Sequence, residues 1–260
     1  MSVLIFTSDN QELEDNIARE TAQHLGYKTL NHTFFDEIAQ QYSLDPSKLR
    51  EVMTITPSIL KRMSSKLWHY SLSCVETAVL DRLLEDDIVC WGLGAHLYVL
   101  VVSHVLKVRL VGGDGSAAVT DSKKERQREK WSMMAWQRKE ADPRLYDLVI
   151  NLDQIKPDEA VSTIAATVGY PRFKPMTYSI NNLADRALAA KVKNVLLKTL
   201  TDIQVHAQNG TVVVTTTCLK REKTKKIAAI KEIAGQVEGL GYLEVHWNVD
   251  RVNEAAMGNR

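Results

Sequence analysis

The chain has 260 residues, of which 45% are hydrophobic and 25% are charged, an ordinary mixture for a globular protein long enough to build two modest cores. Lys and Arg number 33 against 32 Asp and Glu, which leaves a formal charge of +1. Because the two signs nearly cancel, the chain has no overall electrostatic field that would draw it to nucleic acid or anionic lipid. We expect no nucleic-acid partner, and any other charged partner must meet a local patch.

Three features predict a cytoplasmic protein. The N-terminal residues lack a basic lead followed by an apolar run, which predicts no secretory signal. The longest apolar stretch, residues 95–110, is broken by polar and charged residues and is too short to span a bilayer. The cysteines, Cys74, Cys90 and Cys218, form no C-x-x-C pair and are typical of free thiols in a reducing compartment.

Short apolar strands alternate with helices through residue 169. Strands are predicted at residues 3–7, 27–30, 87–91, 105–111 and 145–152. Helices are predicted at residues 16–26, 34–42, 57–84, 95–102, 122–139 and 157–168, with a further one opened by Asp45 as N-cap and Pro46 at its first position. Strands joined by helices imply right-handed crossovers and a parallel sheet covered on both faces. The expected fold class for residues 1–169 is therefore a three-layer α/β domain.

The pattern changes after this unit. Residues 170–179 contain two prolines and are expected to be a linker. Helix 182–199, strands 202–207 and 211–217, helix 222–240 and strand 242–249 follow, with Asn209 and Gly210 marking a hairpin between the two adjacent strands. The order α-β-β-α-β predicts a small α+β domain over residues 180–250, and residues 251–260 are expected to form a frayed tail.

The connection between the first strand and the first helix lacks what a phosphate-binding loop requires. Residues 8–15 contain no glycine and no lysine, and they carry four carboxylates: Asp9, Glu12, Glu14 and Asp15. A phosphate loop needs glycines so that backbone N–H groups can approach the oxygens, and it needs a cation. We expect an acidic helix start here, stabilised by the helix dipole rather than by a bound phosphate.

Two family resemblances arise from short motifs. Residues 1–169 resemble the cytidylate kinase-like group of nucleoside monophosphate kinases, which have the P-loop kinase fold. The blocks that carry this likeness are IAR at residues 17–19, WGLGAH at 91–96, VLKVRLV at 105–111 and DPRLYDLVIN at 142–151. Residues 180–249 look like a BON domain, from the element order and from Ile203-x-Val205, NGTV at 209–212 and IAGQVEGL at 233–240.

The kinase resemblance implies a catalytic apparatus, and most of its parts are missing. The glycine-rich loop is replaced by residues 11–14, Leu93 stands where the family has an arginine for the acceptor phosphate, and the arginine-bearing lid is shortened. Because phosphoryl transfer depends on positioned cations, these losses predict a catalytically inactive, regulatory or binding protein with no catalytic residue, cofactor or metal. The alternative is an active CMP-type kinase that uses ATP and magnesium.

A weaker anion-binding or nucleotide-binding site is a further hypothesis. Arg126 and Arg128 match the family's paired arginines, and Glu125 stands where an aspartate is common. The other candidates near the crevice are Lys61, Arg62, Gly112, Gly113 and Gly115, whose glycines can form a backbone nest. The competing interpretation is that the glycines close a shortened loop and that the charged helix is a solvated face.

The second unit has one local charge feature. Five cations lie at the start of its second helix: Lys220, Arg221, Lys223, Lys225 and Lys226. They oppose the helix dipole unless an anion is present, and the BON resemblance implies an anionic membrane surface or an acidic protein as partner. A solvated helix face is the alternative. The sequence does not set the oligomeric state.

One tryptophan pair and one histidine pair are expected to be structural. Trp131 and Trp136, on the charged helix, are predicted to pack rather than to stack on a ligand. His96 and His104 have no metal-ligand spacing and are predicted to be core or boundary residues.

Overall fold

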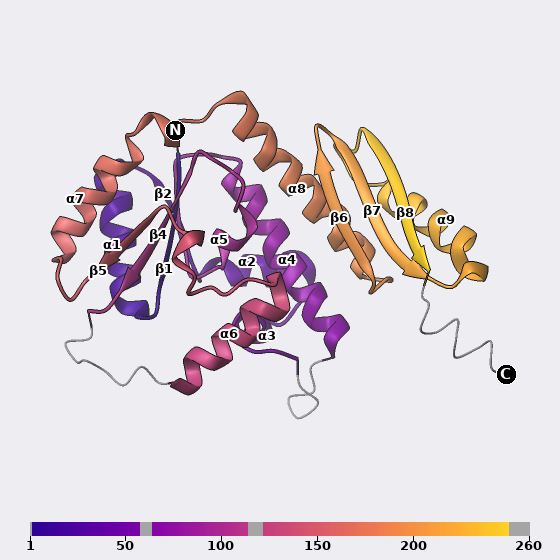
Figure 1. The fold of residues 1–260 in the computed structure, drawn as a ribbon, viewed down its shortest axis with the longest axis horizontal. Helices are drawn as coiled ribbons and strands as arrows, with labels where there is room; N and C mark the ends of the chain where they lie inside the picture. Colours follow the sequence, from indigo (N-terminus) through magenta and orange to yellow (C-terminus); the bar gives the residue numbers. More distant parts are fainter. Residues whose placement is uncertain (1, 58–63, 114–121, 250–260) are drawn as a thin grey trace. The chain divides into compact units, whose positions relative to one another are not determined.

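The computed structural model describes residues 2–57, 64–113 and 122–249, with the side chains of 122–125 left aside (Figure 1). The chain divides into two compact units, Met1–Leu183 and Ala184–Arg260, and the division falls inside one long helix. Each unit is considered by itself below. The expected tail, residues 251–260, lies outside the described residues.

The first unit is built on a five-stranded sheet whose pairings are all parallel. The strand order β2-β3-β1-β4-β5 places β1 at the centre, with β3 and β4 as its neighbours. This confirms the predicted parallel α/β fold. The strands are β1 (Val3–Ser8), β2 (Lys28–Leu30), β3 (Ile88–Trp91), β4 (Val105–Val111) and β5 (Leu148–Asn151).

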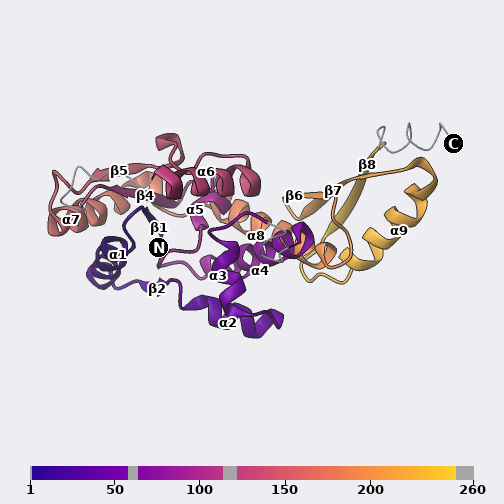
Figure 2. The same ribbon diagram turned by 90° about the horizontal axis from the view of Figure 1, so that it is seen from below.

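Helices cover both faces of this sheet (Figure 2). On one face, side chains of α1 and α7 join those of the central strands in a single apolar cluster that includes Phe6, Ile17, Val108 and Ile164. On the other face α5 lies against β1, and α4 packs on α5. The helices are α1 (Gln11–Leu25), α2 (Phe34–Tyr42), α3 (Pro46–Val52), α4 (Ser65–Leu83), α5 (Ala95–Tyr98), α6 (Ser122–Trp136) and α7 (Pro157–Val168).

Side-chain caps fix where several helices begin. The Asn10 side chain accepts hydrogen bonds from the backbone N–H groups of Glu12 and Leu13, which sets the start of α1 directly after β1. Asp45 accepts from the backbone N–H of Ser47 and so confirms the predicted cap of α3. These caps place the first turn of α1 at the carboxyl end of the central strand.

Several predicted helix bounds were wrong, and local chemistry explains the differences. The helix predicted from residue 57 begins at Ser65, because the Ser64 hydroxyl caps it by accepting from the Leu67 N–H; residues 58–63 are not described. The helix predicted to run to residue 102 ends at Tyr98, where β-branched valines follow. The charged helix ends at Trp136, and Gln137 adopts a positive φ of 55°.

The segment predicted as a linker contains regular structure. A 3-10 turn, η3 (Pro171–Phe173), buries Phe173 against the larger core, and the carbonyl of Phe173 accepts a hydrogen bond from the Ser2 hydroxyl at 2.7 Å. Helix α8 (Thr177–Leu197) then begins five residues before the predicted start at 182. Residues 170–179 therefore belong structurally to the first unit.

The second unit is a three-stranded sheet with helices on one face. Strand β6 (Ile203–Gln208) pairs antiparallel with β7 (Thr211–Cys218), which pairs parallel with β8 (Tyr242–Val249). Side chains of α8 and of α9 (Lys223–Ala234) pack together on this sheet, among them Val192, Val214 and Ile230. The helix predicted over 222–240 is shorter: α9 ends at Ala234, and Gly239 adopts a left-handed φ of 85°, which a right-handed helix cannot contain.

The predicted hairpin is confirmed. Asn209 and Gly210 both have positive φ, as the tight turn between twisted strands requires. The side chain of Asp185, on α8, accepts from the backbone N–H groups of Asn209 at 2.7 Å and of Gly210 at 3.0 Å. A helix carboxylate thus fastens the turn.

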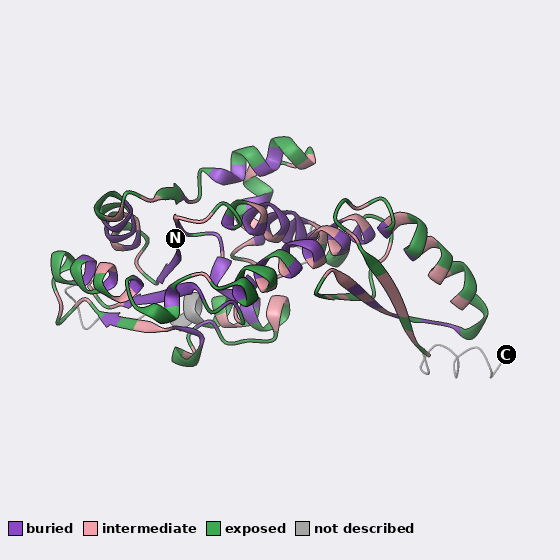
Figure 3. Ribbon diagram, turned by 90° about the horizontal axis from the view of Figure 1, so that it is seen from above, coloured by how far each residue is buried: buried purple, intermediate pink, exposed green. Residues whose placement is uncertain are grey.

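Burial differs between the two sheets (Figure 3). All six residues of β1 are buried, whereas β6 alternates between partly buried and exposed residues, as expected for a sheet with one solvated face. Across the described residues, the helices are all too short or too polar to cross a bilayer.

Candidate functional site

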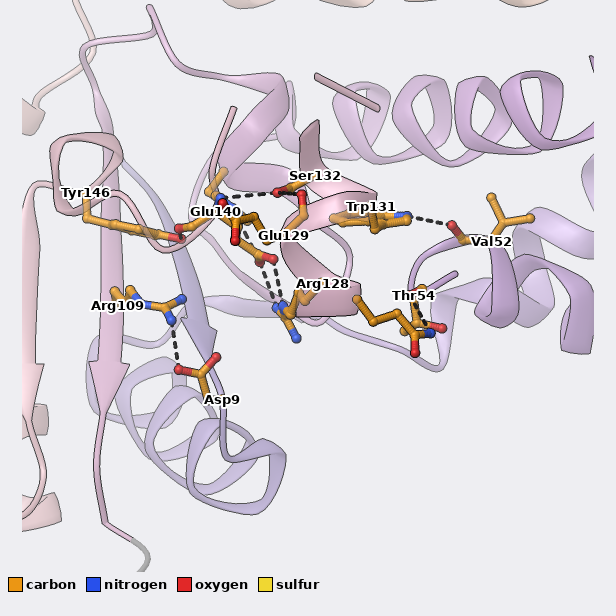
Figure 4. A network of polar contacts seen from close by, with 12 residues as sticks. Asp9, Val52, Thr54, Arg109, Arg128, Glu129, Trp131, Ser132, Glu140 and Tyr146 are labelled. Atoms are coloured by element: carbon orange, nitrogen blue, oxygen red, sulfur yellow. Dashed lines mark hydrogen bonds and ion pairs between the residues drawn. The ribbon is translucent and has the colours of Figure 1, made fainter. Parts of the chain in front are cut away.

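The parallel sheet brings three chain segments to one edge. Strands β1, β3 and β4 end together, and the residues that follow them, at Asp9, Gly92 and Gly112, meet at their carboxyl ends. In open parallel sheets this edge is the usual place for a ligand. The polar groups gathered here form the candidate site (Figure 4).

Arg128, predicted as an anion ligand, is held by a carboxylate of the chain itself. From α6 its Nε donates to Oε2 of Glu140 at 2.6 Å and its Nη2 donates to Oε1 at 2.7 Å, a bidentate pair. The Glu140 side chain is 5% exposed and that of Arg128 is 44% exposed. Burial by itself would raise the pKa of Glu140, but the hydrogen bonds and the charge of Arg128 outweigh the effect of burial. The pKa of Glu140 is therefore lowered, and its carboxylate is ionised.

A second pair joins β4 to the loop after β1. Arg109 Nη2 donates to Oδ2 of Asp9 at 2.8 Å, although the residues are 100 positions apart in sequence. The Arg109 side chain is 9% exposed and Asp9 is 58% exposed. The guanidinium also lies over the ring of Tyr146, 5.7 Å from its centroid, and the Tyr146 hydroxyl donates to the backbone carbonyl of Glu140. Both arginine pairs thus border one aromatic ring.

The first turns of α1 contribute two more carboxylates. Glu14 is 5% exposed, and its pKa is raised to about 8, chiefly by burial, with Asp15 and Glu140 adding to the rise and Arg128 opposing it. Glu14 is therefore largely uncharged at neutral pH. Asp15 accepts a hydrogen bond from the indole N–H of Trp91 at the end of β3. The acidic helix start that the sequence predicted is thus folded into the site, and one of its carboxylates is buried.

His96 is the most deeply buried ionisable ring of the site. It is 1% exposed and stacks on Tyr146 with ring centroids 5.5 Å apart. Burial lowers its pKa to about 4, so the ring is neutral at pH 7. Its Nε2 lies 3.6 Å from Oε1 of Glu140, which is longer than a hydrogen bond, and neither ring nitrogen has a hydrogen-bond partner among the described residues.

The glycine turn after β4 is closed by another carboxylate. Gly112 and Gly113 have φ values of 74° and 91°, two successive left-handed residues rather than the αR-αL pair of a backbone nest, and the Gly113 N–H donates to Oδ1 of Asp153 at 2.7 Å. A Cβ on Gly112 would meet Asp153 Oδ2 at 2.5 Å, and one on Gly113 would overlap Leu13. The loop-closing interpretation is thereby favoured, since the N–H is already bound to an internal anion.

Of the remaining predicted ligands, the structure describes Arg126 alone. Arg126 is exposed on α6. Lys61, Arg62 and Gly115 lie outside the described residues, so their prediction is not examined by the structure. Within the described ranges no group of three or more His, Cys, Asp or Glu side chains is placed to hold a metal ion.

The aromatic pair on α6 packs as predicted. Trp131 is 3% exposed and its indole N–H donates to the carbonyl of Val52 at 2.7 Å. Trp136 lies 5.1 Å from it and 5.5 Å from Tyr98, ring centroid to ring centroid. These contacts anchor α6, and with it Arg128, at the sheet edge.

The basic segment of the second unit is partly engaged in local contacts. Lys226 Nζ donates to the carbonyl of Thr217 at 2.7 Å, and Lys223 Nζ lies 4.4 Å from the Trp247 ring centroid. Lys220, Arg221 and Lys225 are exposed, and Arg221 lies 3.9 Å from the carboxylate of Glu222. The patch therefore faces solvent at Lys220, Arg221 and Lys225.

The sequence interpretation missed four residues that build the site: Arg109, Glu140, Asp153 and His96 as a neighbour of Glu140. Arg109 did leave a signal, because a strand buried on both faces rarely carries two cations, and Lys107 and Arg109 are both in β4. Lys107 pairs with Asp147 at 2.8 Å. Glu140 left no such signal, because it follows a charged helix.

Comparison with known proteins bears on the first unit. Residues 14–119 match the cytidylate kinase-like family. The match begins at Glu14 and ends before α6, so it includes Arg109 and excludes Arg128 and Glu140. No curated protein matches the chain. Among solved structures, a crystal structure of an uncharacterized protein from Eubacterium ventriosum ATCC 27560 is similar, with 11% identity, a TM-score of 0.44, and coverage of 65% of this chain and 98% of that one.

Proposed function

We propose that the first unit is a catalytically inactive cytidylate kinase-like domain with a regulatory or binding role. The observation that carries this proposal is that carboxylates of the chain hold the groups that could receive a phosphate. Glu140 binds Arg128 through both of its oxygens, Asp9 binds Arg109, and Asp153 accepts from the Gly113 N–H.

The electrostatic consequence follows from the chemistry of phosphoryl transfer. Catalysis of this reaction depends on cations and N–H dipoles that stabilise developing negative charge. In this site each described cation is already compensated, and Asp15 adds a further carboxylate beside Trp91. A triphosphate would have to displace several anions at once, which opposes binding in a transferring geometry.

The test is a direct assay of phosphate transfer from ATP to CMP with magnesium. We expect no transfer above a no-enzyme background for the wild-type chain or for Arg128→Ala. Transfer that is well above background and is lost in Arg128→Ala would overturn the proposal in favour of an active CMP-type kinase. Arg50→Ala is a matched control, because Arg50 also pairs with a carboxylate, Asp36 at 2.8 Å, on a different surface.

For the second unit we propose a BON-like module whose basic segment contacts an anionic partner. The support is the order helix, antiparallel hairpin, helix and parallel return strand, together with the exposed cations Lys220, Arg221 and Lys225. Such a patch suits an acidic protein or an anionic lipid headgroup.

Co-sedimentation with vesicles that contain anionic lipid, at low salt, distinguishes these partners. Binding that is lost in the triple variant Lys220→Ala, Arg221→Ala and Lys225→Ala identifies the lipid surface. If the wild-type chain does not bind these vesicles, an acidic protein is the partner that remains. The control variant Lys191→Ala, which removes a cation of α8 outside the segment, should bind the vesicles as the wild type does.

A further inference from the structure

Unpartnered buried polar atoms gather at one place in the first unit. In the described part of the chain, five side-chain polar atoms are buried without a hydrogen-bond partner, and four belong to Thr7, His96 and Arg109. The fifth, on Asp86, is elsewhere. Buried polar groups are nearly always paired, so a concentration of this kind calls for an explanation.

The three residues are neighbours in space. Thr7 and Arg109 are register partners on the adjacent strands β1 and β4, so their side chains lie on the same face. Arg109 and His96 both lie against the ring of Tyr146: the Arg109 Cζ is 5.7 Å from the ring centroid, and the His96 and Tyr146 ring centroids are 5.5 Å apart. Among the described residues, the buried atoms without a hydrogen bond of good geometry are Thr7 Oγ1, Arg109 Nη1 and the two ring nitrogens of His96, and the Tyr146 hydroxyl is the polar group next to Thr7 and Arg109.

These atoms are mainly hydrogen-bond donors. Arg109 Nη1 can only donate, the Thr7 hydroxyl can donate, and the neutral His96 ring donates from one nitrogen. A group that accepts several hydrogen bonds within a small volume would satisfy them together, as the oxygens of a tetrahedral oxyanion do.

Charge narrows the class of ligand. In the part of the chain that the structure describes, Arg109 forms its ion pair with Asp9, whose side chain is 58% exposed and can turn into solvent without a burial penalty. Displacing Asp9 frees one buried positive charge. Glu140, whose Oε1 lies 3.6 Å from His96 Nε2, is a buried anion beside these groups, and its charge is offset by the bidentate contact from Arg128.

We propose that Arg109, His96 and Thr7 form a site for a single phosphoryl oxyanion, which enters by displacing the carboxylate of Asp9 from Arg109. The inference rests on the proposed function in that the site binds and does not transfer phosphate. No covalent step is involved. Asp9 acts as an internal competitor, and the occupant is either free phosphate or the phosphoryl group of a nucleotide monophosphate.

The experiment measures the affinity of the full chain for inorganic phosphate at pH 7 by calorimetry, with the His96 ring signals followed by NMR. We expect saturable binding in the wild-type chain with a shift of those signals. Asp9→Ala should bind about fivefold more tightly, because a half-exposed ion pair no longer competes. Arg109→Gln should bind at least tenfold more weakly.

A matched control separates this effect from a general change of charge. Asp36→Ala removes the same charge from an exposed Asp–Arg pair of the same 2.8 Å length and should leave phosphate affinity unchanged. Tighter binding in both Asp variants would overturn the proposal, as would equal affinity in Asp9→Ala and wild type. If Arg109→Gln does not fold, the Asp9→Ala comparison and the His96 shifts decide.

Two other ligands, CMP and acetate, complete the test. Tighter binding of CMP than of phosphate identifies a nucleotide occupant, and equal binding identifies phosphate itself; both support the site. Acetate that binds as tightly as phosphate would contradict the phosphoryl assignment. An absence of saturable phosphate binding to Asp9→Ala would mean that ordered water satisfies these atoms. These binding measurements do not depend on phosphate transfer. A failure of the proposed phosphoryl site can therefore be told apart from a failure of the proposal that the first unit is catalytically inactive.

Discussion

The two units carry their cations in opposite ways. In the first, Arg109 and Arg128 sit on a strand and a helix and are held by carboxylates that tertiary structure brings to them. In the second, five basic residues lie within seven positions of sequence, and three of them, Lys220, Arg221 and Lys225, are exposed, while Lys226 donates to the carbonyl of Thr217 and Lys223 lies over the Trp247 ring. The cations that cluster along the sequence therefore lie mostly at the surface, whereas the two arginines of the first unit are tied into an internal network of ion pairs.

The largest expected effect comes from breaking the buried pair. Glu140→Ala leaves Arg128 without its carboxylate beside the buried His96, and we expect about 3 kcal/mol lower stability. The loss of stability is not larger because the Arg128 side chain is 44% exposed, so water can hydrate its guanidinium once the carboxylate is gone. Urea denaturation measures the change. Glu37→Ala, which removes the carboxylate of the exposed pair with Arg82, should cost at most about 1 kcal/mol, and equal losses would contradict the distinction.

A smaller effect concerns pH. The folded-state pKa of Glu14 is raised from 4.5 to about 8, so the folded chain keeps a proton that the unfolded chain releases. The resulting stabilisation is complete below pH 4.5 and is lost as pH rises towards 8. His96 acts in the opposite sense, but only below pH 6.5, because its folded pKa is lowered to about 4.

The window from pH 6.5 to 8 therefore isolates Glu14. There we expect wild-type stability to fall by about 2 kcal/mol, and Glu14→Gln should remove most of this slope. Urea midpoints at several pH values measure it. The exposed Glu12→Gln, on the same helix turn, should retain the wild-type slope; if Glu14→Gln retains it as well, Glu14 is not the buried proton carrier.

The smallest expected effects lie in the second unit. Lys223→Ala removes the cation above Trp247 and should lower stability by about 0.5–1 kcal/mol. Lys225→Ala removes the same charge from an exposed position and should change stability by less than about 0.5 kcal/mol. Thermal unfolding followed by tryptophan fluorescence compares them, and equal losses would show that the Trp247 contact contributes nothing.

Local chemistry made much of the fold predictable. The Asn209–Gly210 turn, the Asp45 cap and strand β8 were all correct, because each depends on neighbours within a few residues. Helix ends were less predictable: α9 stops at Ala234, since glycine can be tolerated inside a helix or can end it. The segment 170–179 was expected to be a linker, yet the burial of Phe173 depends on a core elsewhere in the chain.

The site was predictable only in part. Arg128 could be named from sequence, but its partner Glu140 could not, because a carboxylate twelve residues away after a charged helix has no distinguishing pattern. The unusual charge of β4 was visible, yet which anion meets Arg109 depends on the pairing of β4 with β1.

The sequence by itself determined the parallel α/β fold, the hairpin unit and the absence of glycine and lysine between β1 and α1, since these follow from hydrophobic period and local residue type. Tertiary structure decided how the charges are used. Burial made Glu14 a neutral acid, and strand order placed Asp9 on Arg109. The physical reason is that desolvation and ion pairing depend on atoms within a few ångströms, which sequence distance does not report.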